Sequence, residues 1–251
     1  MTIANLAPPL TPVGEIIPSL KSQGYAIIGA TSVAQIAHTS LADLQGLAVT
    51  WEGMPRDPYL RDGGRYRYRR HGSYEVKGDV LQRVPHRAHW QSVSYNALHG
   101  GIERWFDPIS LDVENNSAWQ SLLLGMAHLL SSLKPVNTWF IEAHQFRIDT
   151  TDGIGRPTPE GAHRDGVDFV AVFLLDRVNI KGGETRIFES AGSAGLRFTL
   201  TEPWSLLLMN DERMIHESTP IQPIGGYGHR DTLVLTFRSN GFQDSPKNSQ
   251  Q

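Results

Sequence analysis

Six short runs of β-branched and aromatic residues between residues 139 and 238 set the strongest limit on the fold of this chain. Gly, Pro, Asn and Asp separate the runs, as expected of strands joined by turns. The runs are Trp139–Ile148, Phe169–Leu175, Glu184–Phe188, Leu196–Leu200, Trp204–Met209 and Thr232–Arg238. So many strands within about a hundred residues favour a double-stranded β-helix, the jelly roll of cupins.

The N-terminal part has helical rather than period-two spacing. Apolar residues recur at helical intervals in Ile16–Leu20 and in Ser32–Leu47, where Ser32 is the expected N-cap. The clearest helix is Ser117–Leu133, whose broad apolar face should lie against a sheet and which Pro135 ends.

We therefore expect an α+β fold that is mainly β, with helices packed on one face of the jelly roll. The whole chain, residues 1–251, is expected to form a single catalytic domain. Within it we expect a mixed α/β N-terminal extension at 1–136, the jelly-roll core at 137–240 and a flexible tail at 241–251.

Composition excludes several classes of function. The chain has no cysteine, which rules out disulfides, thiolate nucleophiles and Cys-based metal sites. With 23 Lys and Arg against 26 Asp and Glu, the net charge of −3 gives no general attraction to nucleic acid or to an acidic membrane. Met1–Pro12 lacks the pattern of a secretory signal, and no run is long enough to span a bilayer. We expect a cytoplasmic protein with a small-molecule partner; its oligomeric state, including a homodimer, is left open.

One basic segment, Arg65–His71, alternates arginine with tyrosine. By itself it is compatible with a stripe that binds single-stranded nucleic acid. A plain strand with alternating Tyr and Arg is the favoured interpretation, and a third is that one or two of the arginines bind a substrate carboxylate.

Two histidines and an aspartate are the candidate metal ligands. In an extended chain, residues two apart point to the same side, so His163 and Asp165 can face one interior point. His216, which follows the strand Trp204–Met209 and a turn, is the candidate third ligand. Two His and one carboxylate form the facial triad of non-haem iron(II) oxygenases, although a zinc hydrolase with three protein ligands is also compatible.

A fourth candidate lies on the last predicted strand, fourteen residues after His216. Arg230 and Thr232 share one face of this strand, where the guanidinium could clamp the distal carboxylate of a metal-chelating 2-oxoglutarate. Arg238 has the same parity and is the rival. The structural alternative for Arg230 is an ordinary salt bridge with Asp231 or Glu217.

Several motifs together resemble the bacterial isoleucine-dioxygenase family of 2-oxoglutarate/iron(II) oxygenases, whose members hydroxylate free L-amino acids. The matching stretches are Glu160–Phe169, Gly182–Thr185 and Gly228–Val234, supported by Asp57–Tyr59, Arg65–Arg70 and His144–Arg147. The resemblance implies that His163, Asp165 and His216 bind iron and that Arg230, beside Thr232, binds 2-oxoglutarate.

The same resemblance implies that the protein hydroxylates an unactivated C–H bond of a free L-amino acid, aliphatic like Leu, Ile or Met. The reaction would require Fe(II), consume 2-oxoglutarate and O2, and release succinate and CO2. Ascorbate would serve as an activator in vitro. The substrate-binding candidates are Arg164, Asp168, Arg147, Tyr68 and Arg67. Arg164 could instead form a surface ion pair, and Asp168 could instead hold a ligand imidazole. The amino acid and the position of hydroxylation stay open.

Two other functions are compatible with a jelly roll that carries these ligands. One is a cupin-type metal enzyme that does not use 2-oxoglutarate, and the other is a non-catalytic protein that binds a small molecule. Neither needs a buried cation at Arg230, so this residue discriminates between them and the oxygenase.

Overall fold

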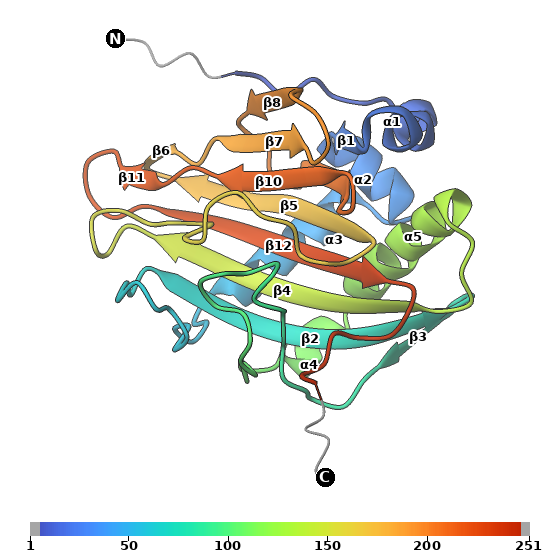
Figure 1. The fold of residues 1–251 in the computed structure, drawn as a ribbon, viewed down its shortest axis with the longest axis horizontal. Coiled ribbons are helices and arrows are strands. Elements are labelled where there is room, and N and C mark those ends of the chain that lie inside the picture. Colours follow the sequence, from blue (N-terminus) through green and yellow to red (C-terminus); the bar gives the residue numbers. More distant parts are fainter. Residues whose placement is uncertain (1–5, 247–251) are drawn as a thin grey trace.

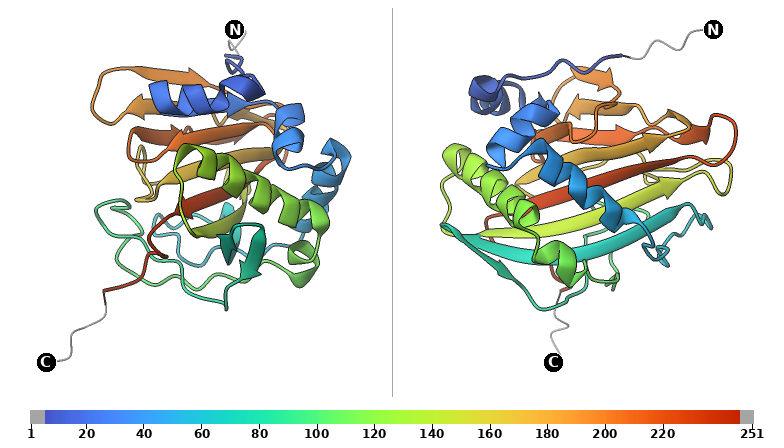
Figure 2. Two further views of the ribbon diagram at one scale, coloured as in Figure 1. Left: turned by 90° about the vertical axis from the view of Figure 1, so that its right-hand side faces the viewer. Right: turned by 180° about the vertical axis from the view of Figure 1, so that it is seen from behind.

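The computed structural model describes residues 6–246, in which a large twisted sheet is covered by helices on one face and by smaller sheets on the other (Figures 1 and 2). The large sheet is antiparallel, with strand order β1-β9-β5-β12-β4-β2-β3. Its strands are β1 (Tyr25–Ile28), β2 (Arg67–Lys77), β3 (Val80–Arg83), β4 (Trp139–Asp149), β5 (Phe169–Val178), β9 (Leu206–Asn210) and β12 (His229–Arg238).

The smaller sheets contain the remaining strands. They are β6 (Ile180–Gly182), β7 (Thr185–Glu189), β8 (Gly195–Phe198), β10 (Met214–Ser218) and β11 (Ile221–Pro223), in the orders β10-β7-β8 and β11-β6. Side chains from β5 and β9 pack against side chains from β7, β8 and β10 in one apolar cluster, which joins the sheets. The predicted jelly roll is confirmed, because each expected run forms most of a strand.

The helices cover the outer face of the large sheet (Figure 2). They are α1 (Ile16–Gln23), α2 (Ala30–Ile36), α3 (Leu41–Gly46), α4 (Leu111–Glu114) and α5 (Ser117–Leu133), with 3-10 turns at Val13–Glu15 and Leu47–Trp51. Helix α5 has the predicted bounds, and the Asn116 side chain caps it by accepting from the Ala118 N–H.

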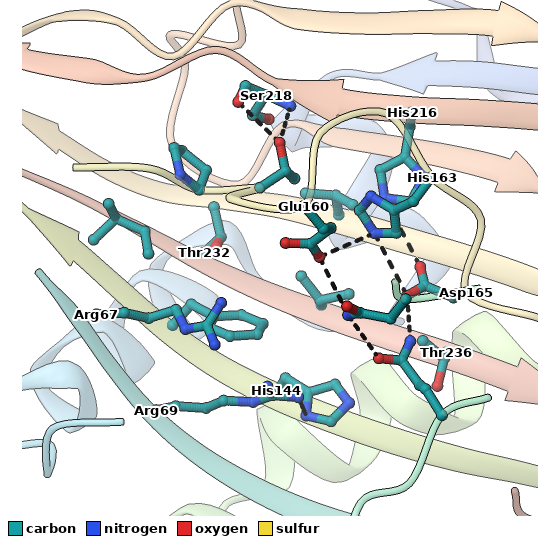
Figure 3. Close-up of a pocket in the computed structure, with 18 of the residues that line it drawn as sticks. Arg67, Arg69, His144, Glu160, His163, Asp165, His216, Ser218, Thr232 and Thr236 are labelled. Atoms are coloured by element: carbon teal, nitrogen blue, oxygen red, sulfur yellow. Dashed lines mark hydrogen bonds and ion pairs between the residues drawn. The ribbon is translucent and has the colours of Figure 1, made fainter. Parts of the chain in front are cut away.

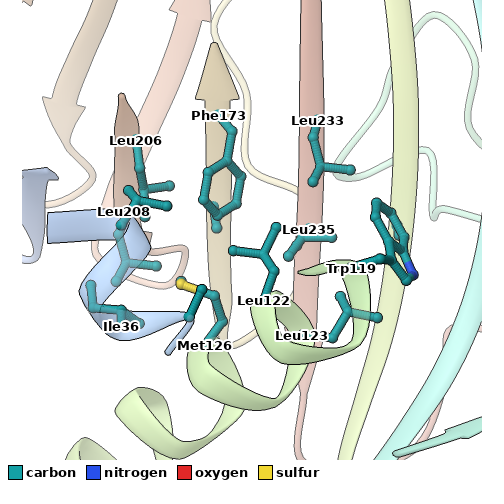
Figure 4. Packing of buried hydrophobic residues seen from close by; sticks show 14 of the residues in the cluster. Ile36, Trp119, Leu122, Leu123, Met126, Phe173, Leu206, Leu208, Leu233 and Leu235 are labelled. Carbon is teal, nitrogen blue, oxygen red and sulfur yellow. The ribbon is translucent and has the colours of Figure 1, made fainter. Parts of the chain in front are cut away.

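Helix α5 supplies the centre of the outer core. Trp119, Leu122 and Met126 are fully buried and face apolar side chains of β5, β9 and β12 (Figure 4). On β12 these contacts come from Leu233 and Leu235, which point away from the alternate residues of the same strand. The outer face of β12 is therefore fixed by packing, and its other face is directed between the sheets.

The predicted helix over Ser32–Leu47 is wrong in its continuity. The chain forms α2 and α3 instead, separated by His38, which has a left-handed φ of 49°. Ser32 lies inside α2, whereas Ser40 caps α3 by accepting from the Asp43 N–H at 3.0 Å. Ser40, with Asp43 three residues later, thus begins the second helix.

The boundaries expected within the chain also need correction. Strands β1, β2 and β3 come from the N-terminal part but belong to the large sheet, so that sheet is not confined to residues 137–240. In the expected tail, Gln243 is buried and its amide donates to the carbonyl oxygens of Asp165 and Gly166. The tail is therefore held in place over its described part, residues 241–246, while 247–251 lie outside the described residues. Between residues 6 and 246 no helix is long and apolar enough to cross a bilayer.

Candidate metal centre and its pocket

The predicted ligands meet at one point between the sheets (Figure 3). His163, in the loop before β5, pairs with His216 on β10 through two reciprocal backbone hydrogen bonds of 3.0 Å. Asp165 follows two residues after His163 and points to the same side. One ligand-type atom from each of the three side chains lies within 4.8 Å of the others, and the Asp165 carboxylate is 3.8 Å from Nε2 of both histidines.

Neighbouring groups fix the orientation of this cluster. The Gly161 carbonyl can only accept, so the 2.9 Å contact makes Nδ1 of His163 the donor and directs Nε2 toward Asp165. Asp211 accepts backbone N–H bonds from Asp165, Gly166 and Val167, which fixes the loop that carries Asp165. The Gln91 amide donates to Oδ1 of Asp165 at 2.9 Å.

The ionisation of His216 and Asp165 suits a cation. Burial and the nearby His163 lower the pKa of His216 to about 4, so its imidazole is neutral at pH 7. Although burial acts in the opposite direction, the two imidazoles lower the pKa of Asp165, which keeps it a carboxylate. Two imidazole nitrogens and a carboxylate oxygen on one side of a cavity are the donor set of a non-haem iron(II) centre.

Arg230 lies on the wall of the same pocket. Alternate residues of β12, namely Arg230, Thr232, Val234 and Thr236, line the pocket, as the parity of the strand predicts. Arg230 is 3% exposed, and its Nε has no hydrogen-bond partner within residues 6–246. Burial, with the nearby Arg177, lowers its pKa to about 10, so it remains a cation at neutral pH.

The structure does not contain the salt bridges that were the alternative role for Arg230. Asp231 pairs with Arg147, and Glu217 pairs with Arg186, so neither forms a salt bridge with Arg230. The rival Arg238 does not line the pocket. A buried guanidinium without an acidic partner, facing a cavity, fits the distal carboxylate of 2-oxoglutarate.

The basic segment that contains Arg67 and Tyr68 forms β2 and is not a surface stripe. Arg67 lines the pocket and donates from Nε to Asp57 at 2.7 Å. Tyr68 points to the opposite face and packs against the outer core. Arg147 on β4, which pairs with Tyr68 in the sheet, also faces outward and donates two hydrogen bonds to Asp231. The structure thus brings Arg67 into the pocket but neither Tyr68 nor Arg147.

Arg164 and Asp168 also lie away from the pocket. Arg164 donates to the carbonyl oxygen of Glu212 and lies over the ring of Tyr95. Asp168 accepts from Lys134 and from the backbone and hydroxyl of Ser239, and it contacts no ligand imidazole. Arg164 lies between two candidate ligands in the sequence and Asp168 lies three residues after the second, but the loop turns both side chains elsewhere.

Several pocket residues were not predicted from the sequence. Arg69 lies two residues after Arg67 on the same face of β2, and this spacing could have identified it. The others lie in loops without periodicity or on the face of β4 that lines the pocket. They are His89, Gln91, Arg104, Glu160 and His144.

A second group of ligand-type side chains lies beside the pocket: His71, His89, Glu142 and His144, all buried. Glu142 accepts from both His71 and His89, at 3.1 and 3.3 Å, and from Arg87 at 3.3 Å. Arg69 donates to Nδ1 of His144 at 3.0 Å. Two guanidinium groups within hydrogen-bond distance would repel a divalent ion, so this group is a hydrogen-bond network that includes two residues of the pocket wall, His89 and His144.

Comparison with known proteins supports the chemistry of the first cluster. The family model described as 2OG-Fe dioxygenase matches residues 48–236. The chain is 45% identical to a bsmA homolog from Methylobium petroleophilum PM1 of known crystal structure, with a TM-score of 0.90 over 96% of this chain and 98% of that one. A search of curated proteins found no match.

Two further solved structures share the fold at low identity. IDO from Bacillus thuringiensis is 18% identical with a TM-score of 0.73, covering 96% of this chain and 99% of its own. The Fe(II)/α-ketoglutarate-dependent dioxygenase TqaL is 17% identical with a TM-score of 0.66, covering 90% and 86%. The jelly roll with helices on one face is therefore a shared architecture.

Proposed function

Because this chain belongs to the 2OG-Fe dioxygenase family, it is an oxidoreductase that uses Fe(II), 2-oxoglutarate and O2, and we propose that its substrate is a free L-amino acid. The observation that carries the proposal is the convergence of His163, Asp165 and His216 in a pocket whose wall holds a buried Arg230 without an acidic partner. We also propose that the chain belongs to the isoleucine-dioxygenase-like branch that its motifs resemble.

In this proposal the three convergent side chains hold the iron. Bound iron(II) supplies the activation of O2 that couples the decarboxylation of 2-oxoglutarate to succinate with the hydroxylation of a C–H bond. Arg230 receives the distal carboxylate of 2-oxoglutarate, with the Thr232 hydroxyl beside it. Gln91 holds the Asp165 carboxylate in its ligating orientation.

The pocket offers groups of both charges to a substrate, which supports a zwitterion. Oε2 of Glu160 is buried without a partner and can accept from an ammonium group. Arg67, Arg69 and Arg104 line the pocket and can donate to a carboxylate. The aliphatic side chain implied by the resemblance would have few apolar neighbours, namely Phe146, Ile148, Pro157, Val172 and Val234. The proposal therefore covers free amino acids as a class.

The test is aerobic incubation of the purified protein with Fe(II), ascorbate and 2-oxoglutarate against a panel of free L-amino acids. We expect at least one amino acid to gain one oxygen by mass spectrometry, with an equal amount of succinate formed. Asp165→Ala should abolish this coupled turnover, whereas Asp79→Ala, which changes an exposed carboxylate, should leave it unchanged. Succinate formation that no amino acid stimulates would contradict the proposal.

A further inference from the structure

Three arginines form one side of the pocket, and two of them lack a counter-charge. Arg67, Arg69 and Arg104 are at most 5% exposed, and Arg67 pairs with Asp57. Among residues 6–246 no carboxylate forms an ion pair with Arg69 or Arg104. Nε of Arg69, Nε of Arg104 and Nη2 of Arg67 are buried donors without an acceptor. Leaving three such donors unpaired is costly, which indicates that a ligand supplies acceptors.

Aromatic rings and an amide hold the two unpaired guanidinium groups in place. Arg69 lies between two phenyl rings, 4.0 Å from the centroid of Phe106 and 4.6 Å from that of Phe146. Arg104 donates from Nη2 to Oε1 of Gln91 at 2.8 Å. These contacts restrain both side chains before any ligand binds, so a ligand would lose little affinity to ordering them.

Neighbouring groups do not neutralise this pair. Glu142 is occupied by His71, His89 and Arg87, and Asp57 is occupied by Arg67. The imidazoles add no charge at neutral pH, because burial lowers the pKa of His89 to about 3 and also lowers the pKa of His144. The remaining carboxylate of the pocket lining, besides Asp165, is Glu160, whose Oε1 lies 3.6 Å from Nε2 of His163.

The charges at the metal and cosubstrate can be summed separately from those of the other residues that line the pocket. On the cosubstrate side, the positive charges of iron(II) and Arg230 are balanced by Asp165 and the two carboxylates of 2-oxoglutarate. Among the other residues that line the pocket, Arg69 and Arg104 carry two positive charges and Glu160 carries one negative charge, which leaves one positive charge in excess. A zwitterionic aliphatic amino acid would not change this excess, but an amino acid with a net charge of −1 would remove it.

We propose that the substrate is an L-amino acid with an acidic side chain, whose two carboxylates are received by the Arg67, Arg69 and Arg104 side of the pocket and whose ammonium group faces Glu160. This inference rests on the proposed amino-acid hydroxylase function and narrows its substrate class. It accounts for the unpaired donors of the arginines and for the unpaired acceptor Oε2 of Glu160.

The test compares acids with their amides, which have nearly the same shape but one charge less. L-glutamate, L-aspartate and L-2-aminoadipate are titrated by calorimetry against L-glutamine, L-asparagine and L-leucine, under anaerobic conditions, with protein saturated in Fe(II) and 2-oxoglutarate. We expect at least one acid to bind tenfold or more tightly than every neutral amino acid of the panel. Equal or tighter binding of a neutral amino acid would overturn the proposal, as would displacement of the acid by additional 2-oxoglutarate.

A variant on β2 links the preference to the arginine side. Arg69→Gln should bring the affinity ratio of acid to amide close to one while changing the Kd of 2-oxoglutarate less than twofold. Arg70→Gln is the matched control, since Arg70 is the next residue on β2 and points to the other face. Arg69→Lys keeps the positive charge and should retain part of the preference if Arg69→Gln fails to fold. An unchanged ratio in a folded Arg69 variant would refute the assignment.

The same samples separate this inference from the function on which it rests. Coupled hydroxylation of leucine, isoleucine or methionine without activity on the acids would overturn the acidic substrate and leave the amino-acid hydroxylase in place. If no amino acid of the panel supported coupled turnover, the proposed amino-acid hydroxylase function itself would be wrong, whatever the binding preference.

Discussion

Replacing Arg230 by Met should separate cosubstrate binding from stability. The substitution keeps much of the side-chain volume but removes the cation that faces the metal cluster. Two charge-assisted hydrogen bonds to a carboxylate contribute about 3–4 kcal/mol together. At 1.4 kcal/mol per factor of ten, the Kd of 2-oxoglutarate should rise on the order of 10²- to 10³-fold.

The same substitution should not lower the stability of the ligand-free protein. Arg230 is buried without an acidic partner and lies near Arg177, so its removal relieves an unpaired charge. We expect the unfolding free energy of the ligand-free variant to be unchanged or to rise by ~1–2 kcal/mol. The stabilisation that 2-oxoglutarate gives the iron-loaded wild type, about 2.7 kcal/mol at one hundred times Kd, should be largely lost at the same concentration.

Calorimetry under anaerobic conditions and urea unfolding measure both effects. Arg147→Met is the matched control, because Arg147 is another strand arginine, but it faces away from the pocket and pairs with Asp231. This control should be destabilised by about 3–5 kcal/mol, since it leaves Asp231 buried without its partner, and should keep its 2-oxoglutarate affinity. A wild-type Kd for 2-oxoglutarate in Arg230→Met would refute the assignment of the clamp.

Three further predictions follow from named contacts. Gln91→Leu should weaken iron(II) binding about 10- to 100-fold in a metal titration, because the Asp165 carboxylate loses its 2.9 Å donor; unchanged affinity would show that Gln91 does not orient the ligand. Leu123→Ala should cost about 2–5 kcal/mol in urea unfolding and leave the Kd of 2-oxoglutarate unchanged, since Leu123 is fully buried on the helix side of the large sheet. Burial lowers the pKa of His89 to about 3 in the folded protein, so the unfolded chain binds more protons between that value and about 6.5, and stability falls as the pH drops below 6.5. Between pH 7 and pH 5 this one residue should account for about 2 kcal/mol, which His89→Gln should remove from the pH dependence of metal-free unfolding.

The parts of the fold that were predictable from the sequence have one buried face. The strands between residues 139 and 238 and helix α5 show clear periods because one side of each packs in an apolar core. On β12 the apolar residues Leu233, Leu235 and Phe237 identify the outer face, which assigns Arg230 and Thr232 to the other face correctly.

The substrate side of the pocket was not predictable in the same way. On β2, both faces carry polar or aromatic residues, so the sequence does not show that Arg67 and Arg69 point inward while Tyr68 and Arg70 point outward. That orientation is fixed by the pairing of β2 with β4. His89, Gln91 and Arg104 come from a long connection between β3 and α4, where no period exists to read.

A crystal structure of the protein with Fe(II) and 2-oxoglutarate, grown under anaerobic conditions and measured at the iron absorption edge, tests the metal centre most directly. The anomalous peak should lie about 2.0–2.2 Å from Nε2 of His163, Nε2 of His216 and a carboxylate oxygen of Asp165, with the distal carboxylate of 2-oxoglutarate on Arg230. A peak among His71, His89, Glu142 and His144, or a cosubstrate that does not contact Arg230, would contradict the assignment.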